Sequence, residues 1–183
     1  MSDTAEPPRV RGTGVLGTCT ELPSTLHIAG TELSRTQSPP SLACWSGYLP
    51  GPPGSEPAGL NVVIEPAAPP DEATLRLAHD VASRFHELVD RAREYCRTRL
   101  REPGFGLTAG ELGLLDLPAL PLAVPEATVW DEDGWAVRFA ESGLGTADPY
   151  GILVMFDGTR PVDLQVLDGS DGSDGVDGPH GEA

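Results

Sequence analysis

The sequence contains no lysine, and all 12 of its basic residues are arginine. Against them stand 28 aspartates and glutamates, so that the formal net charge is -16. Proteins bind nucleic acids and anionic membranes largely through lysine and arginine that neutralise phosphate. We therefore expect neither a nucleic acid nor a membrane as partner, whereas a basic protein partner is allowed. Composition says nothing about a small-molecule ligand.

Cysteines and long apolar runs are also scarce. Cys19, Cys44 and Cys96 are widely spaced and form no CxxC pair, which predicts reduced thiols rather than a disulfide framework or a zinc knuckle. No run approaches the roughly 18 apolar residues of a membrane span, and residues 1–11 lack the apolar centre of a secretory signal. We expect a cytoplasmic protein, and its arginine-, alanine-, glycine- and proline-rich usage is similar to that of GC-rich bacteria.

Motifs for catalysis and metal binding are absent or incomplete. Gly12–Gly17 matches GxGxxG, but it neither follows an apolar strand nor opens a helix, so it predicts an ordinary loop. His79 and His86 share a helix face at a separation of about 10 Å, which is too far for one metal ion. The aspartates of the C-terminal tail match no calcium-binding spacing. We predict no catalytic residue, no metal site and no cofactor.

One long run free of glycine and proline is the clearest structural feature. Apolar residues recur every three or four positions from Glu72 to about Arg101, which predicts one long amphipathic helix with Asp71 as its N-cap. Residues 71–102 contain seven arginines and seven acids, so the excess negative charge belongs to the rest of the chain. The spacing of Thr108 and Glu111 predicts a second, short helix with a capping box.

Alternation of apolar and polar residues replaces the helical period toward the C-terminus and predicts four short strands in an antiparallel meander. Their expected bounds are 128–130, 135–139, 152–156 and 162–167. Candidate strands in the N-terminal third are 15–16, 26–28, 45–49 and 60–64. We predict a single α+β domain over residues 11–167, with a mostly antiparallel sheet and one long helix. A flexible N-terminus (1–10) and a disordered, Asp/Gly-rich tail (168–183) are expected to flank it.

The predicted hairpin turn at residues 131–134 combines acidic and aromatic residues. Asp131, Glu132 and Asp133 lie between Trp130 and Trp135. Tryptophans beside acids can anchor a protein interface, which makes these five residues the candidate partner-binding site. The alternative is a solvated turn whose tryptophans pack inward, as large aromatic side chains in strands often do.

The stretch WDEDGWAVRFAE (130–141), together with DPYGILVMFDG (148–158), resembles the C-terminal part of small uncharacterised bacterial proteins. These include immunity-type proteins of polymorphic toxin systems. The resemblance carries no catalytic residue. It implies a non-enzymatic α+β protein whose acidic surface covers a basic toxin domain.

The leading functional hypothesis is thus a non-catalytic bacterial protein that acts by protein binding, with an immunity-type inhibitor of a basic toxin domain as its specific form. A second hypothesis is an enzyme of an unrecognised family that uses cleft carboxylates such as Glu141, Asp148 or Asp157. A third is an accessory or structural protein that is kept soluble by its acidic tail. The sequence specifies neither the partner nor the oligomeric state.

Overall fold

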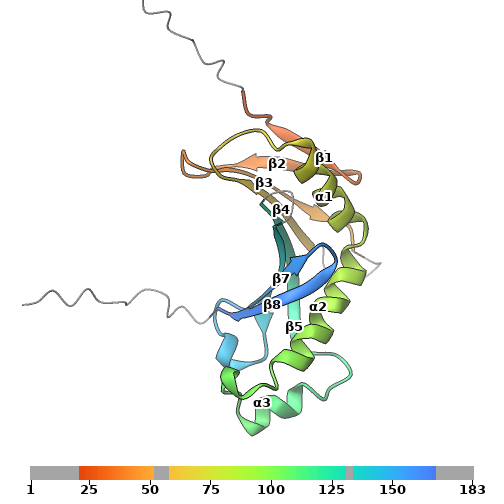
Figure 1. Cartoon of the computed structure of the whole chain (residues 1–183), viewed down its shortest axis with the longest axis vertical. Coiled ribbons are helices and arrows are strands. Elements are labelled where there is room, and N and C mark those ends of the chain that lie inside the picture. The colour runs from red at the N-terminus through yellow and green to blue at the C-terminus, as the bar shows by residue number, and fades with distance from the viewer. Residues whose placement is uncertain (1–20, 52–57, 131–133, 168–183) are drawn as a thin grey trace, which may run out of the picture.

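The structure, a computed structural model, describes residues 21–51, 58–130 and 134–167. Eight strands form one sheet in which spatial order follows chain order (Figure 1). All neighbouring strands are antiparallel except β4 and β5, which run parallel. The strands are β1 (Thr25–Ile28), β2 (Thr31–Thr36), β3 (Ala43–Leu49), β4 (Ala58–Ile64), β5 (Leu122–Val129), β6 (Trp135–Ser142), β7 (Ile152–Asp157) and β8 (Arg160–Val166).

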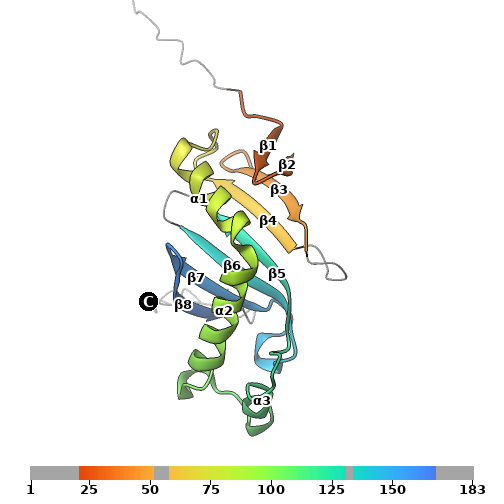
Figure 2. The same cartoon turned by 90° about the vertical axis from the view of Figure 1, so that its right-hand side faces the viewer.

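The α-helices of the described residues lie in the connection between β4 and β5. Two parallel neighbouring strands cannot be joined by a tight turn, so the chain must cross over the sheet between them. This crossover carries α1 (Glu72–Ser83), α2 (Phe85–Arg99), the 3-10 helix η1 (Pro103–Phe105) and α3 (Ala109–Leu114). A second 3-10 helix, η2 (Gly145–Ala147), follows β6. Helices α1 and α2 both pack on one face of the sheet (Figure 2).

The expected fold class was wrong in two respects. The protein is mostly sheet, with 38% of the described residues in strands and 28% in helices, and the parallel pairing of β4 with β5 makes the sheet mixed. A single long helix is also absent from the described residues, because the helix breaks at Arg84, where φ is -115° and ψ is 15°. A straight helix cannot follow a strongly twisted sheet across its whole width. The break lets α1 contact β1 and β5 while α2 contacts β8.

Predictions that depend on neighbouring residues were more accurate than predictions of how distant segments are arranged. The C-terminal meander is present as β5–β8, and Gly158 occupies the left-handed region (φ 58°) in the predicted turn between β7 and β8. Asp71 caps α1, and Thr108 with Glu111 forms the predicted capping box of α3. Strand β2 was missed because Leu33 is its only buried residue. Four predictions concern segments outside the described residues: the candidate strand 15–16, the motif Gly12–Gly17, the flexible N-terminus (1–10) and the disordered tail (168–183).

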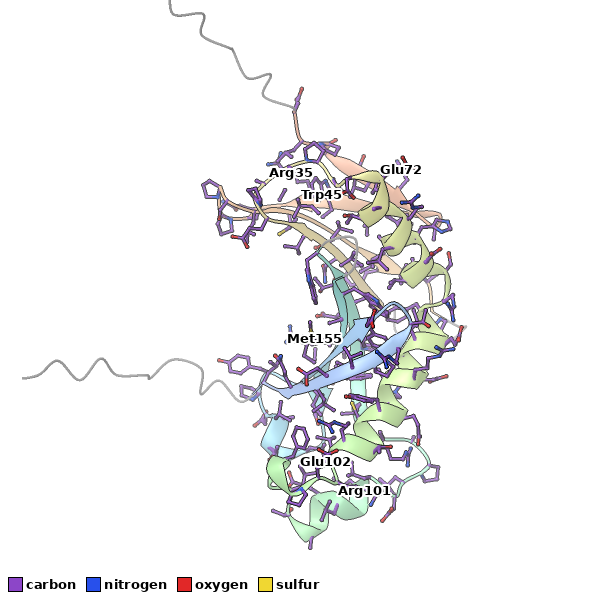
Figure 3. The ribbon with its side chains drawn as sticks, in the orientation of Figure 1. Arg35, Trp45, Glu72, Arg101, Glu102 and Met155 are labelled. Carbon is purple, nitrogen blue, oxygen red and sulfur yellow. The ribbon has the colours of Figure 1, made fainter. Side chains whose placement is uncertain are left out.

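The core lies between the sheet and the α1–α2 layer. Trp45, Trp135 and Phe139 are its largest fully buried side chains. The indole nitrogen of Trp45 donates to the carbonyl of Pro23 at 2.8 Å, and that of Trp135 donates to the carbonyl of Gly158 at 2.8 Å. Each buried indole therefore has the hydrogen-bond partner that its burial requires. Figure 3 shows Trp45 on the side of the sheet that faces α1.

Glu111 ties α3 to η2. Its carboxylate accepts hydrogen bonds from the backbone N–H of Thr108 at 2.9 Å, from the Thr108 hydroxyl at 2.7 Å and from the backbone N–H of Thr146 at 3.2 Å. These donors, with the backbone of Thr108 first among them, hold the pKa of Glu111 below its ordinary value. A carboxylate with a lowered folded-state pKa stabilises the fold above its unfolded-state pKa, and that stabilisation is lost as the pH falls through the folded-state value.

We accordingly expect the Glu111→Gln variant to be less stable than the parent chain at pH 7. We also expect the difference between the two to shrink as the pH falls below about 4.3, the ordinary glutamate pKa, because the parent then loses the charged carboxylate. Urea unfolding at pH values from 7 to 3 measures both effects. A stability difference that stays constant over this range would contradict the role assigned to the Glu111 carboxylate.

Candidate functional site

The two faces of the sheet differ in what covers them. Helices α1 and α2 cover one face, whereas no helix or strand in the described residues covers the other, which lies on the inner side of the curved sheet (Figure 1). We call this second surface the open face. Figure 3 shows Met155, from β7, on that side.

Strand register identifies the residues of the open face. One continuous row crosses seven strands, because each member pairs directly with the next: Ser34, Ser46, Asn61, Thr128, Ala136, Met155 and Asp163. The adjacent row on the same face contains Tyr48, Gly59, Glu126, Arg138, Leu153 and Gln165. Both rows are mainly polar, with small side chains near the centre.

The open face is polar but partly recessed. Ala136 is completely buried although it belongs to this face and not to the core cluster, so neighbouring side chains shield it. Tyr48 is the opposite case, since 72% of it is exposed, which is more than any other large hydrophobic residue in the described chain. One face of an antiparallel sheet is commonly left to solvent. A hydrated, polar, concave surface of this kind suits a polar partner better than an apolar one.

Charge is distributed unequally between the two layers. Each of the seven arginines between residues 76 and 101 forms an ion pair with a nearby acid: Arg76–Glu72, Arg84–Glu87, Arg91–Glu87, Arg93–Asp90, Arg97–Glu94, Arg99–Glu102 and Arg101–Asp116. Several of these arginines also bind backbone carbonyl groups. Arg97, for example, donates to the carbonyls of Leu115 at 2.8 Å and Leu117 at 2.9 Å. The helical layer is therefore neutral and its cations are engaged.

The acidic side chains of the open face are less fully paired with cations than those of the helical layer. Arg138 lies 3.7 Å from Glu126, but Glu32 and Asp163 form no ion pair within the described part of the chain. Surface pairs contribute little to stability, so the imbalance matters for association rather than for folding.

Two of the five predicted partner-binding residues, Trp130 and Trp135, lie within the described residues. Trp135 is 1% exposed and stacks on Phe156 with ring centroids 4.1 Å apart, so it belongs to the core and offers no surface to a partner. Its pairing with Val129, which is also buried, explains why this tryptophan points inward. Trp130 is half-buried, and its backbone N–H donates to the carbonyl of Gly134 at 3.0 Å. Asp131, Glu132 and Asp133 lie outside the described residues.

The carboxylates considered for catalysis lie at three separate places in the chain. Glu141 is exposed near the end of β6, Asp148 follows η2, and Asp157 ends β7 with its carboxylate 3.3 Å from Arg160. None of them lines either of the two hollows described below.

The histidines and cysteines are equally dispersed. His79 and His86 are exposed on separate helices, and no group of three metal-ligating side chains gathers in residues 21–51, 58–130 and 134–167. Cys96 is buried, and burial raises the pKa of its thiol to about 12, so that it is protonated and unreactive at neutral pH. Cys44 is half-buried, and Cys19 lies outside the described residues.

Two shallow hollows occur in the described structure. The first, with a volume of about 640 Å³, lies between β2 and β3 near the turn that follows β1, and its lining includes Glu32, Ser34, Ser46 and Tyr48. The second, of about 570 Å³, lies near the other end of β2 and includes Arg35 and Gln37. Sequence reasoning missed the first. The alternation of buried and exposed side chains along β3 could have revealed this hollow, because it places Tyr48 on the face opposite to Trp45 and Leu49.

None of the helices in the described residues is long and apolar enough to cross a membrane. No family model, curated protein or solved structure matches this chain.

Proposed function

We propose that this chain acts by binding a basic protein partner on the open face of its sheet. The observation that supports the proposal is the contrast between the two layers. The helical layer is neutral and internally paired, whereas the open face is uncovered, polar and acidic. Complementary charge on a partner would speed association and favour the correct orientation.

The size of the open face is adequate for a specific complex. Eight strands at a spacing of about 4.8 Å span about 34 Å, and six residues per strand extend about 20 Å. Their product, about 680 Å², is close to the roughly 800 Å² that each partner buries in an interface of standard size. The face can therefore hold a folded domain as well as an extended segment.

An immunity-type inhibitor that covers a basic toxin domain in the bacterial cytoplasm is the specific form of this proposal. It agrees with the acidic open face, and no observation on the described residues favours the enzymatic or accessory alternatives over it. A toxin gene directly upstream of the gene for this chain would support this form, and a basic domain encoded there would be the first partner to test.

Two arginine substitutions of equal charge test the proposal. Thr128→Arg places a cation and a bulky side chain in the middle of the open face, whereas Thr98→Arg places the same side chain on the exposed surface of α2. Full-length parent and variant chains are immobilised and exposed to native lysate at increasing salt, after thermal melting has shown that each is folded.

We expect one basic protein to be retained by the parent chain and by Thr98→Arg at low salt, released at high salt, and lost from Thr128→Arg. Retention by Thr128→Arg, or equal loss from both variants, would contradict binding on the open face. Ser46→Arg, in the same row two strands away, provides an independent replacement if Thr128→Arg does not fold.

A further inference from the structure

We infer that the hollow between β2 and β3 is a binding site for an arginine or lysine side chain of the partner, with Glu32 and Tyr48 as its main contacts. This inference rests on the proposed function, since the cation is presented by the polypeptide that occupies the open face. The hollow between β2 and β3 would thus be the place on the acidic open face where a cationic side chain of the partner binds.

Register brings the contact residues together. Ser34 pairs with Ser46, and continuing this antiparallel pairing by two residues places Glu32 opposite Tyr48. On the β4 side, Tyr48 pairs with Gly59, and Gly59 pairs in turn with Glu126 of β5. Tyr48 therefore has a carboxylate on each side along one row of the open face. Adjacent strands are about 4.8 Å apart, so a long side chain lying over Tyr48 can reach Glu32. Glu126 lies two strands from Tyr48 and is already paired with Arg138.

The contacts available in this row fit a cation. The Tyr48 ring is 72% exposed, and neither its hydroxyl nor the Glu32 carboxylate has a hydrogen-bond or ion-pair partner in the residues that the structure describes. Aromatic faces attract guanidinium and ammonium groups, and an adjacent carboxylate adds direct charge pairing. Hydroxyl groups of Ser34 and Ser46 line the same hollow and can accept further hydrogen bonds.

Two glycines shape this part of the sheet. A Cβ at Gly47 would lie 2.7 Å from the Leu33 side chain, so the absence of a side chain lets Leu33 fill the core beneath the hollow. A Cβ at Gly59 would lie 3.1 Å from Cγ of Glu126. The absence of a side chain at Gly59 therefore leaves room for the Glu126 side chain. The Glu126 side chain therefore fills the space over Gly59, and the hollow itself lies on the β2 side of Tyr48.

An arginine-containing probe tests the site directly. The probe is a fluorescein-labelled peptide of four Gly-Arg repeats, and its matched control carries citrulline, which has nearly the same shape without the charge, in place of arginine. Binding to the full chain is followed by fluorescence anisotropy. Glu72→Gln is the matched protein control, because it removes one carboxylate, 91% exposed, from the helical layer.

We expect Glu32→Gln and Tyr48→Leu each to raise the Kd for the arginine peptide by about fivefold or more, whereas Tyr48→Phe and Glu72→Gln change it less than twofold. The citrulline peptide should bind weakly to every chain. Equal effects of Glu32→Gln and Glu72→Gln, or of Tyr48→Leu and Tyr48→Phe, would overturn the site, since binding would then depend on bulk charge alone or would not require the aromatic ring.

The same variants separate this inference from the proposed function. If Thr128→Arg loses the partner while Glu32→Gln and Tyr48→Leu retain both partner and peptide at parental affinity, the cation site is wrong and the open face still binds. If Thr128→Arg retains the partner, the proposed function fails, whatever the peptide shows.

Discussion

Replacing Trp135 with alanine is expected to lower the free energy of unfolding by about 3–5 kcal/mol. The indole is 1% exposed, stacks on Phe156, and donates a hydrogen bond to the carbonyl of Gly158 across the turn between β7 and β8. Truncation would leave a large cavity and an unpaired carbonyl group. Urea unfolding followed by circular dichroism measures the loss.

Trp130→Ala is the matched control, because Trp130 is half-buried just after β5. We expect it to cost much less, on the order of 1 kcal/mol. Similar costs for the two substitutions would contradict the assignment of Trp135 to the core and would return it to the set of candidate surface residues.

Replacing Gly151 with alanine is expected to destabilise the fold by about 3 kcal/mol or more, because left-handed strain and overpacking add. Gly151 has a φ of 87°, and a Cβ there would meet the carbonyl oxygen of Phe139. The position is also fixed by two backbone hydrogen bonds: its N–H donates to Ala147 at 2.7 Å and its carbonyl accepts from Leu167 at 2.9 Å. The backbone therefore has little freedom to relax.

Gly158→Ala separates the two contributions, since Gly158 also has positive φ, 58°, but a Cβ there would meet nothing within 4 Å. We expect a cost of about 1 kcal/mol, due to the left-handed conformation alone. Thermal and urea unfolding of both variants provide the comparison. A Gly151→Ala protein as stable as Gly158→Ala would show that β6 and β7 can separate at this point without penalty.

Short-range features were predictable from the sequence because neighbouring residues determine them. The N-cap Asp71, the capping box of Thr108 and Glu111, and the turn at Gly158 depend on residues within one or two turns of chain. The break at Arg84 was not predictable, because the apolar spacing of three and four continues on both sides of it. It arises from the twist of a sheet that is formed by distant segments.

The candidate site was predictable only in part, for a related reason. An acidic surface could be expected from the charge balance of the helices, and the ion pairs of the helical layer agree with it. Which aromatic residue reaches that surface depends on strand register. Trp135 is paired with Val129 and points into the core, whereas Tyr48 lies on the open face because of its place in β3.

Binding on the open face is tested most directly by the methyl group of Met155. The chain has two methionines, Met1 and Met155, so 13C-methyl labelling gives a spectrum simple enough to assign. Met155 lies within the row of the open face that crosses seven strands. Saturating amounts of the purified basic partner are added to the labelled full-length chain. The account predicts that the Met155 signal shifts or broadens on complex formation, and an unchanged Met155 signal in a complex of proven stoichiometry would contradict it.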